Sequence, residues 1–262
     1  MVEYALITGA SSGIGLELAR IAASKNMNLI LLARNSEKLM QLRSELEKLY
    51  PIKVLAVGCD LTKSDTVEKI ASLLNGRGIV PDVLINNAGF GMYGAFDKIG
   101  AETEANMIQL NVTALTELTK IIYRQMRSRG KGKILNVSSV AGFMPGPYMA
   151  AYHATKAYVL SFSEALAVEA KGSGVTVTAL CPGPTASNFE NRASAGAGIK
   201  MFQKSGKLPT AKKVAEYGWK NMMKGKTIAV HGRNFRRLIL LIRFLPRKMV
   251  ANATGKMQAP GK

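Results

Sequence analysis

The chain has 262 residues, 47% of them hydrophobic and 20% charged, which excludes a disordered, collagenous or coiled-coil protein. This length fits a single α/β domain. The formal net charge of +19 lies mostly in residues 199–262, which contain 16 Lys/Arg and one acid, so it does not mark the whole chain as a nucleic-acid-binding protein.

Apolar, β-rich runs alternate with amphipathic segments of helical length, which is typical of βαβ units and a parallel sheet. The runs lack polar alternation, as expected of strands that helices cover on both faces. We therefore predict an α/β fold in residues 1–232, with a doubly wound seven-stranded parallel sheet. The predicted strands are Tyr4–Ile7, Asn28–Ala33, Lys53–Val57, Val83–Asn86, Lys133–Val137, Val175–Leu180 and Thr227–Val230. The predicted helices are 13–24, 36–49, 64–75, 103–128, 150–171 and 210–223.

A glycine-rich turn follows the first predicted strand and reads Thr8-Gly9-Ala10-Ser11-Ser12-Gly13-Ile14-Gly15. Glycines permit a tight turn and the close approach of a pyrophosphate, and the following helix N-terminus favours an anion. The pattern predicts a Rossmann-type dinucleotide-binding turn, although a strand–helix turn without a ligand has the same glycines. The predicted cofactor contacts in this turn are Gly9, Ser11, Ser12, Gly13, Ile14 and Gly15.

The second predicted strand ends in Ala33-Arg34, where an acid would bind the ribose 2′-hydroxyl of NAD(H). No acid is present, and the Arg34 guanidinium can pair with a 2′-phosphate in bidentate fashion. The sequence therefore favours NADP(H) over NAD(H), unless Arg34 is only a solvated side chain at a strand end.

Polar residues follow the fourth and fifth strands, and Tyr152 and Lys156 lie on the next helix. Residues four apart share a helix face, so the Lys156 ammonium is expected near the Tyr152 phenol. A free phenol has a pKa of about 10. The ammonium and a nicotinamide ring both favour phenolate, so we expect a lowered pKa for Tyr152 and a role for it as the acid/base that acts on the substrate oxygen.

These motifs together resemble the short-chain dehydrogenase/reductase family, in its single-domain type of about 250 residues and its bacterial ketoacyl or steroid reductase-like branch. The resemblance covers residues 4 to about 190. It rests on Thr8-Gly9-x3-Gly13-x-Gly15, Asp60, Asn87-Ala88-Gly89, Asn111, Ser139, Tyr152-x3-Lys156 and Pro182-Gly183.

The resemblance also implies roles for single residues. Ser139, which precedes Tyr152 by 13 residues, is selected over Ser138 to hydrogen-bond the substrate oxygen. Lys156 holds the nicotinamide ribose, and Asn111 supports a water-mediated proton relay. The implied cofactor contacts are Asp60 and Leu61 at the adenine, and Asn87, Ala88, Gly89, Pro182, Gly183, Thr185, Tyr152 and Lys156 elsewhere.

Three details of the resemblance are weaker. Asp60 is equally typical of a helix N-cap, a role for which Thr62 and Ser64 compete. Ser187 stands where the family more often has threonine. NADPH-dependent members often carry Lys or Arg at the position of Ser12, so Arg34 alone carries the cofactor prediction here.

The segments 90–93, 143–149 and 189–207 should contact the substrate and are rich in aromatic residues and methionine. They favour a bulky apolar carbonyl compound, although a hydrophobic core beneath a mobile loop has a similar composition. Residues 193–198 have the composition of a flexible lid.

Residues 233–262 form a basic, apolar C-terminal extension that we do not regard as a separate domain. It suits a subunit-contact or substrate-lid helix, or a short interfacial helix on an anionic membrane. We expect no nucleic-acid partner, because no binding motif is present. The extension leaves both a homodimer and a homotetramer open.

The predicted function is NADPH-dependent reduction of a carbonyl to a secondary alcohol. The same residues serve the oxidative direction, and a non-catalytic dinucleotide-binding protein that uses its basic tail is the alternative of another class. Two distant cysteines and the absence of a recognisable export signal favour a cytoplasmic protein, with peripheral membrane contact left open. His153 should be packed or solvent-facing, and His231 has no second ligand nearby, so no metal is predicted.

Overall fold

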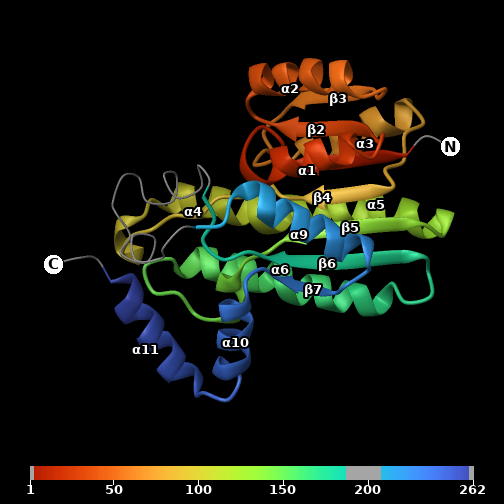
Figure 1. The fold of residues 1–262 in the computed structure, drawn as a ribbon. Helices are drawn as coiled ribbons and strands as arrows, with labels where there is room; N and C mark the ends of the chain where they lie inside the picture. The colour runs from red at the N-terminus through yellow and green to blue at the C-terminus, as the bar shows by residue number, and fades with distance from the viewer. Residues whose placement is uncertain (1–2, 187–207, 260–262) are drawn as a thin grey trace.

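The computed structural model describes residues 3–186 and 208–259 (Figure 1). Its sheet has seven parallel strands in the order β3-β2-β1-β4-β5-β6-β7. The order reverses between β1 and β4, which opens a crevice beyond the carboxyl ends of these strands. The doubly wound fold is confirmed, and every strand lies within one residue of its predicted bounds. The strands are β1 Tyr4–Thr8, β2 Asn28–Ala33, β3 Val54–Gly58, β4 Val83–Asn86, β5 Gly132–Val137, β6 Val175–Cys181 and β7 Ile228–Val230.

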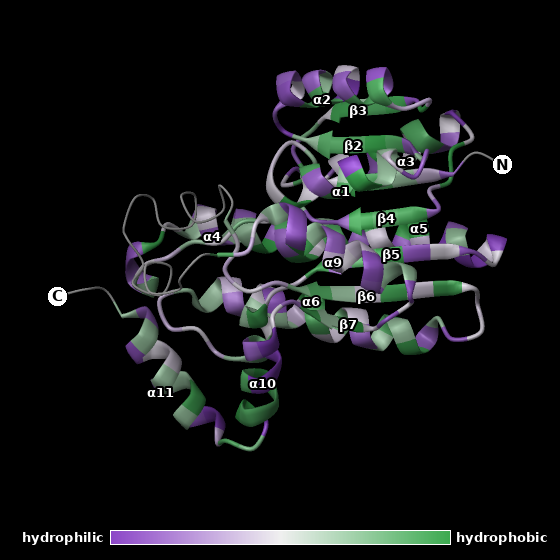
Figure 2. Cartoon of the chain, viewed as in Figure 1, coloured by the Kyte–Doolittle hydropathy of each residue, from purple (hydrophilic) through white to green (hydrophobic). Residues whose placement is uncertain are grey.

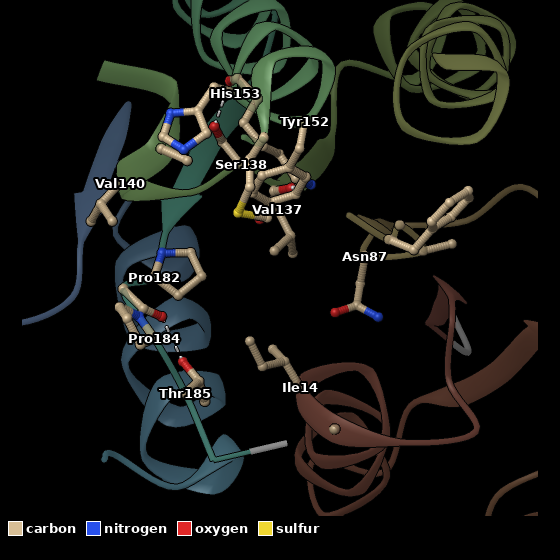
Figure 3. Close-up of a pocket in the computed structure, with 18 of the residues that line it drawn as sticks. Ile14, Asn87, Val137, Ser138, Val140, Tyr152, His153, Pro182, Pro184 and Thr185 are labelled. Carbon is tan, nitrogen blue, oxygen red and sulfur yellow. Dashed lines mark hydrogen bonds between the residues drawn. The ribbon is translucent and has the colours of Figure 1, made fainter. Parts of the chain in front are cut away.

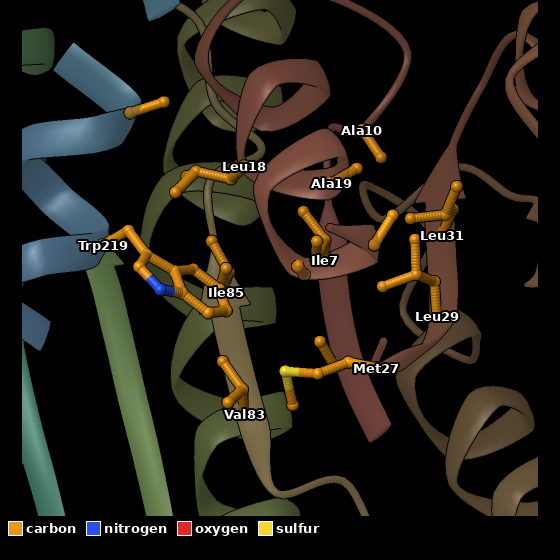
Figure 4. Packing of buried hydrophobic residues seen from close by; sticks show 14 of the residues in the cluster. Ile7, Ala10, Leu18, Ala19, Met27, Leu29, Leu31, Val83, Ile85 and Trp219 are labelled. Atoms are coloured by element: carbon orange, nitrogen blue, oxygen red, sulfur yellow. The ribbon is translucent and has the colours of Figure 1, made fainter. Parts of the chain in front are cut away.

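Helices cover both faces of the sheet. One apolar core packs under α1 (Gly13–Ala23), α2 (Ser36–Leu49) and α9 (Ala211–Met223). Figure 4 shows part of it, in which Trp219 of α9 reaches Ile85 of the sheet near Leu18 of α1, while Ile7 lies beside Ala19. A second core packs under α3 (Thr66–Gly76), α5 (Leu115–Arg129) and α6 (Ala150–Glu169). Two cores of this kind explain why the strands are apolar on both sides.

The single helix predicted over 103–128 is wrong in detail. The structure has α4 (Ala101–Ile108), a π-helical segment (Gln109–Ala114) and then α5. A π-bulge is a common device at functional sites, and this one contains the predicted site residue Asn111.

A buried chain of amides crosses the sheet below the crevice. Asn86 and Asn136 are partners in the β4–β5 register. The Asn86 Nδ2 group donates to Asn136 Oδ1 at 2.9 Å and to Thr119 Oγ1 at 2.8 Å. Asn136 Nδ2 donates to Ser163 Oγ at 3.0 Å. These side-chain hydrogen bonds join two strands to α5 and α6. Because the side chains are buried, a shifted strand register would leave their polar groups unpaired.

The C-terminal extension consists of two helices, α10 (Arg233–Ile242) and α11 (Arg247–Gln258), instead of the one expected. Pro246 stands at the N-cap of α11 and cannot continue α10, which explains the break. The two helices form a V that projects from the body (Figure 1), with apolar residues on both (Figure 2). No helix in residues 3–186 or 208–259 is long and apolar enough to cross a membrane.

Asn136→Leu should lower the free energy of unfolding by about 2–4 kcal/mol, because Asn86 and Ser163 would each keep a buried polar group without its partner. The measurement is the urea midpoint at an unchanged m value. Thr178→Val is the matched control, since Thr178 is equally buried and its Oγ1 makes no hydrogen bond with the described chain. We expect this control to unfold no earlier than the wild type. Equal midpoints for all three proteins would show that the amide chain contributes nothing to stability.

Candidate active site

A cavity of about 1140 Å³ lies beyond the carboxyl ends of the strands. Figure 3 shows its centre, where Tyr152 and Val137 face Ile14 and Asn87, and Pro182 and Thr185 close one side. Sixteen predicted site residues line it: Gly9, Ser11, Ser12, Gly13, Ile14, Arg34, Asp60, Leu61, Asn87, Ala88, Gly89, Tyr152, Lys156, Pro182, Gly183 and Thr185. Three others, Gly15, Asn111 and Ser139, lie behind this lining.

The glycine turn is built around the side chain of Asn87. Asn87 Nδ2 donates to the carbonyl oxygens of Thr8 and Gly9 at 3.0 and 3.2 Å. A Cβ at Gly15 would lie 2.4 Å from both Asn87 Nδ2 and Gly9 O, and Gly9 itself has a φ of +67°. The close approach of Asn87 and Gly9 therefore requires a glycine at position 15, and the predicted contact of Gly15 with a cofactor stays a prediction.

Thr8 completes the junction between the loops after β1 and β4. Its Oγ1 accepts hydrogen bonds from the backbone N–H groups of Asn87 and Ala88, both at 2.9 Å. Thr8 was part of the sequence motif but not of the predicted contact set. Its position at the end of the first strand was the signal for this role.

The N-terminus of α1 points its backbone N–H groups into the cavity. The helix begins at Gly13, has no acid in its first turn and receives no capping hydrogen bond from the Ser12 side chain. The first N–H groups of a helix lack partners within the helix, and with the positive dipole end they are suited to an anion such as a pyrophosphate. The glycine turn and the N-terminus of α1 together fit a dinucleotide.

The end of the cavity that is farther from Tyr152 lies at β2 and β3. Arg34 is exposed at the end of β2 and lines this part. Asp60 Oδ1 accepts from the N–H and the hydroxyl of Thr62, at 3.0 and 2.9 Å. These hydrogen bonds, led by the backbone one, and the charge of Arg34 hold the pKa of Asp60 below its usual range. The helix α3 has Asp65 at its N-cap, so the alternative of Asp60 as a helix cap is wrong.

The Tyr152 and Lys156 side chains lie together on α6, as predicted. Lys156 Nζ is 5.9 Å from the centroid of the Tyr152 ring and donates to Val137 O at 2.8 Å. Ser138 Oγ donates to Lys156 O at 2.8 Å, which ties α6 to the end of β5. Ser139 instead hydrogen-bonds the Tyr152 phenol and donates to Pro182 O at 3.3 Å. The two serines therefore have different partners, and Ser139 is the one that contacts the tyrosine.

Burial dominates the electrostatics of this pair. It raises the pKa of Tyr152 to about 12, against the opposing effect of the Ser139 hydroxyl, and it lowers the pKa of Lys156 to about 8. The Lys156 ammonium alone therefore does not lower the pKa of Tyr152, and the lowering expected from the ammonium and a nicotinamide ring together stays a prediction. The ammonium is directed at Val137 O and is too distant to offset the desolvation of a phenolate. Near neutral pH, Tyr152 is a neutral phenol with a proton to donate.

The loop after β6 closes the cavity opposite α1. Pro182 O accepts from Val140 N–H at 3.0 Å, and Thr185 Oγ1 donates to Gly183 O at 2.9 Å (Figure 3). A Cβ at Gly183 would lie 2.3 Å from the Phe235 ring, so α10 packs directly on this loop. Ser187, the predicted substrate segment 189–207 and the predicted lid 193–198 lie outside the described residues.

Asn111 holds the loop after β4. Its Nδ2 donates to Phe90 O at 2.9 Å and to Thr155 Oγ1 at 3.1 Å, and its Oδ1 accepts from Phe90 N–H at 3.1 Å. A Cβ at Gly89 would approach Asn111 Oδ1 to 2.9 Å and Lys156 Nζ to 3.5 Å. The Asn111 side chain thus positions the loop beside Lys156, and its part in a proton relay stays a prediction.

Comparison with known proteins identifies the family. The model for short chain dehydrogenase matches residues 3–198. The chain belongs to the short-chain dehydrogenase family. It is 34% identical over 184 residues to 17-beta-hydroxysteroid dehydrogenase type 3 of Mus musculus, a match that covers 70% of this chain and spans only 60% of that protein.

Two further short-chain dehydrogenase relatives are informative. A putative ketoacyl reductase of Streptomyces coelicolor is 36% identical over 185 residues, which cover 69% of this chain and 70% of that one. The structure of a short-chain dehydrogenase from Sphingobium yanoikuyae in complex with NADPH aligns with a TM-score of 0.82 at 30% identity, covering 92% of this chain and 94% of that one.

In this short-chain dehydrogenase, hydrogen bonds of Gln258 also connect α11 to residues beside the site. His153 is buried, and its Nδ1 lies 2.8 Å from Met144 O. A carbonyl only accepts, so Nδ1 carries the proton and Nε2 accepts from Gln258 Nε2 at 3.2 Å. Tyr93 donates its hydroxyl proton to Gln258 O at 2.6 Å. His153 is packed, as expected, whereas Gln258 was missed because its partners are distant in sequence. The described residues contain no cluster suited to a metal.

Gln258→Met should speed amide exchange in 247–258 roughly tenfold, because the loss of one buried hydrogen bond removes about 1–2 kcal/mol from the local opening free energy. Hydrogen–deuterium exchange measured by mass spectrometry checks this, with α6 as the internal reference. Lys248→Met, an exposed change on the same helix, is the control and should leave exchange unchanged. Identical exchange in the two variants would mean that Gln258 does not hold α11.

Proposed function

We propose that the protein is an NADPH-dependent oxidoreductase that reduces a carbonyl on a bulky apolar substrate to a secondary alcohol. The observation that carries the proposal is the buried Tyr152 phenol, hydrogen-bonded to Ser139 and one helical turn from Lys156, in the same cavity as the glycine turn. A protein that only bound a dinucleotide would have no use for this buried acid.

The cofactor supplies a hydride when bound, and residues around the cavity would hold it. The glycine turn and the N-terminus of α1 would bind the pyrophosphate. Arg34 would pair with the 2′-phosphate, and Asp60 and Leu61 would flank the adenine. Lys156 would hold the nicotinamide ribose, with Asn87, Ala88, Gly89, Pro182, Gly183 and Thr185 at the sides of the ring. The relative solved with NADPH supports this choice.

Three side chains would carry the chemistry. Tyr152 would give its phenolic proton to the oxygen of the carbonyl that is reduced. Ser139 would hold that oxygen in place, and the positive charge of Lys156, although too distant to offset desolvation by itself, would favour the phenolate that remains. A water relay supported by Asn111 then returns a proton to the phenolate.

The apolar side of the cavity supports a bulky substrate. Phe90, Met144 and Met149 line it next to Tyr152, and α10 and α11 add Leu238 and Leu241. Methionines adapt to different shapes, which suits a ring system or an acyl chain. The steroid dehydrogenase and the putative ketoacyl reductase among the relatives are consistent with such substrates.

The proposal extends to the cellular setting. Both cysteines are free thiols, which supports a cytoplasmic protein. Residues 1–232 would form the catalytic domain and assemble as a homodimer or homotetramer. The oxidative direction uses the same residues and is the second candidate, since Tyr152 would then accept the alcohol proton.

Tyr152→Phe should reduce turnover by roughly 10²–10⁴-fold, because the variant keeps the ring and loses the acid. NADPH affinity should stay nearly unchanged. The measurement is NADPH oxidation with ketosteroids, ketoacyl thioesters, diketones and aromatic aldehydes. Tyr158→Phe makes the same change at an exposed position of α6 and should have wild-type turnover. A fully active Tyr152→Phe protein would remove the proposed acid.

The pH dependence should differ between the two directions. Because burial raises the pKa of Tyr152, the phenol stays protonated across about pH 6–9 and reduction does not lose its acid. Oxidation needs the phenolate, so its rate should rise with pH over the same range. Steady-state rates in both directions check this, and an oxidative rate independent of pH would contradict it.

Arg34→Ala should weaken NADPH binding about 10–100-fold, through the loss of charge-assisted hydrogen bonds to the 2′-phosphate, and should leave NADH binding nearly unchanged. Calorimetric titration with each cofactor checks this. Lys38→Ala is the control for net charge, because Lys38 is exposed nearby on α2 and does not line the cavity. Equal losses for NADPH and NADH would contradict the cofactor assignment.

A further inference from the structure

The junction of α10 and α11 exposes a cluster of large apolar side chains. Phe244 is 81% exposed, and Leu240 and Leu241 are each 59% exposed. Met249 on α11 is 56% exposed. Figure 2 shows hydrophobic colour at the lower end of α10 and in the turn that follows it, away from the sheet. We call residues 240–249 the hairpin tip. Soluble proteins rarely expose several large apolar residues side by side without a partner for them.

The tip is also surrounded by positive charge. The extension contains no acidic residue, and within 233–248 its basic residues are all exposed. They are Arg233, Arg236, Arg237, Arg243, Arg247 and Lys248. None of them forms an ion pair within the described chain. A partner for the tip must therefore offer both negative charge and an apolar phase.

The positive charge of the hairpin tip, together with its apolar side chains, distinguishes between its possible partners. A second copy of this chain in a two-fold contact would bring the same patch against itself, so arginines would meet arginines. A nucleic acid would meet the charge but would leave Phe244 and Leu240 against a polar backbone. An anionic membrane satisfies both, because headgroups pair with the arginines while the apolar side chains enter the acyl boundary.

The tip is continuous with the cavity. Leu241, Leu245 and Met249 belong to the tip and also line the cavity that contains Tyr152. These three apolar residues therefore join the hairpin tip to the lining of the cavity. A lipophilic compound dissolved in a membrane could follow these residues and avoid passage through water.

We propose that the hairpin tip docks on an anionic lipid surface and that the cavity takes its apolar substrate from that surface. The second part rests on the proposed function, whereas the docking does not. The attraction is electrostatic at long range and apolar at contact, so binding requires anionic lipid and weakens with salt.

The first test is sedimentation of the full chain with vesicles of phosphatidylcholine, with or without roughly 30% phosphatidylglycerol. We expect binding only to the anionic vesicles and its loss in about 0.5 M NaCl. Arg243→Gln/Arg247→Gln should weaken binding at least fivefold, since each basic residue near the surface contributes about 1 kcal/mol. Lys212→Gln/Lys213→Gln removes the same charge from exposed positions of α9 and should bind like the wild type.

Leu240→Ser/Phe244→Ser tests the apolar contact. It should also weaken binding, with arginines and cavity lining intact, and its turnover of a water-soluble ketone should equal that of the wild type. Its turnover of a ketone dissolved in anionic vesicles should fall. If both tip variants bound anionic vesicles as strongly as the wild type does, the docking proposal would be wrong. If this variant lost equal turnover with the water-soluble ketone and with the ketone in vesicles, delivery of substrate from lipid would be wrong. If neither the wild type nor the variant turned over any ketone, the proposed function would be wrong and the binding result would stand.

The same variant distinguishes a subunit contact. If Leu240→Ser/Phe244→Ser converts an oligomer to a monomer in sedimentation velocity, and the wild type does not bind anionic vesicles, the tip is an interface between copies and the proposal is wrong.

Discussion

The site depends on the close approach of the loops after β1 and β4. The strand order reverses between these two strands, so their connections leave to opposite sides and a crevice opens between them. Asn87 spans the junction by donating to the carbonyl oxygens of Thr8 and Gly9. This contact is possible because Gly9 and Gly15 have no Cβ. Neither glycine can be replaced without displacing Asn87, and the loop it begins carries Gly89 to the side of Lys156.

The second constraint is the desolvation of two ionisable groups. Burial keeps Tyr152 protonated and makes Lys156 easier to deprotonate, so it shifts both groups towards their neutral forms. Hydrogen bonds offset part of this cost, since Val137 O accepts from Lys156 and Ser139 bonds to Tyr152. The Tyr152 phenol is therefore a proton donor whose position is fixed by residues at the end of β5. Only a further cation near the phenol could favour the phenolate strongly, which is consistent with an acid that ionises late in a reaction.

The sequence predicted most of the fold because buried parallel strands are continuous apolar runs with glycine or polar residues at their ends. It also predicted the residues at those ends, since parallel strands bring their carboxyl ends to one edge. It did not predict contacts between distant segments. The helix predicted over 103–128 is interrupted where the Asn111 side chain bonds to Phe90 in another loop. Periodicity describes the faces of a helix and contains no information on such a partner.

The same reason explains the errors in the extension. The break at Pro246 was not predicted, and the roles of Phe235 and Gln258 depend on Gly183 and His153, which belong to the body of the domain. These contacts make α10 and α11 a wall of the cavity and not an appendage. A wall made of two helices can differ in shape and polarity without any change in β4, β5 or α6, which hold the acid. The Gln258 bond to His153 lies one residue from Tyr152, so the wall that would select the substrate is tied to the helix that would protonate it.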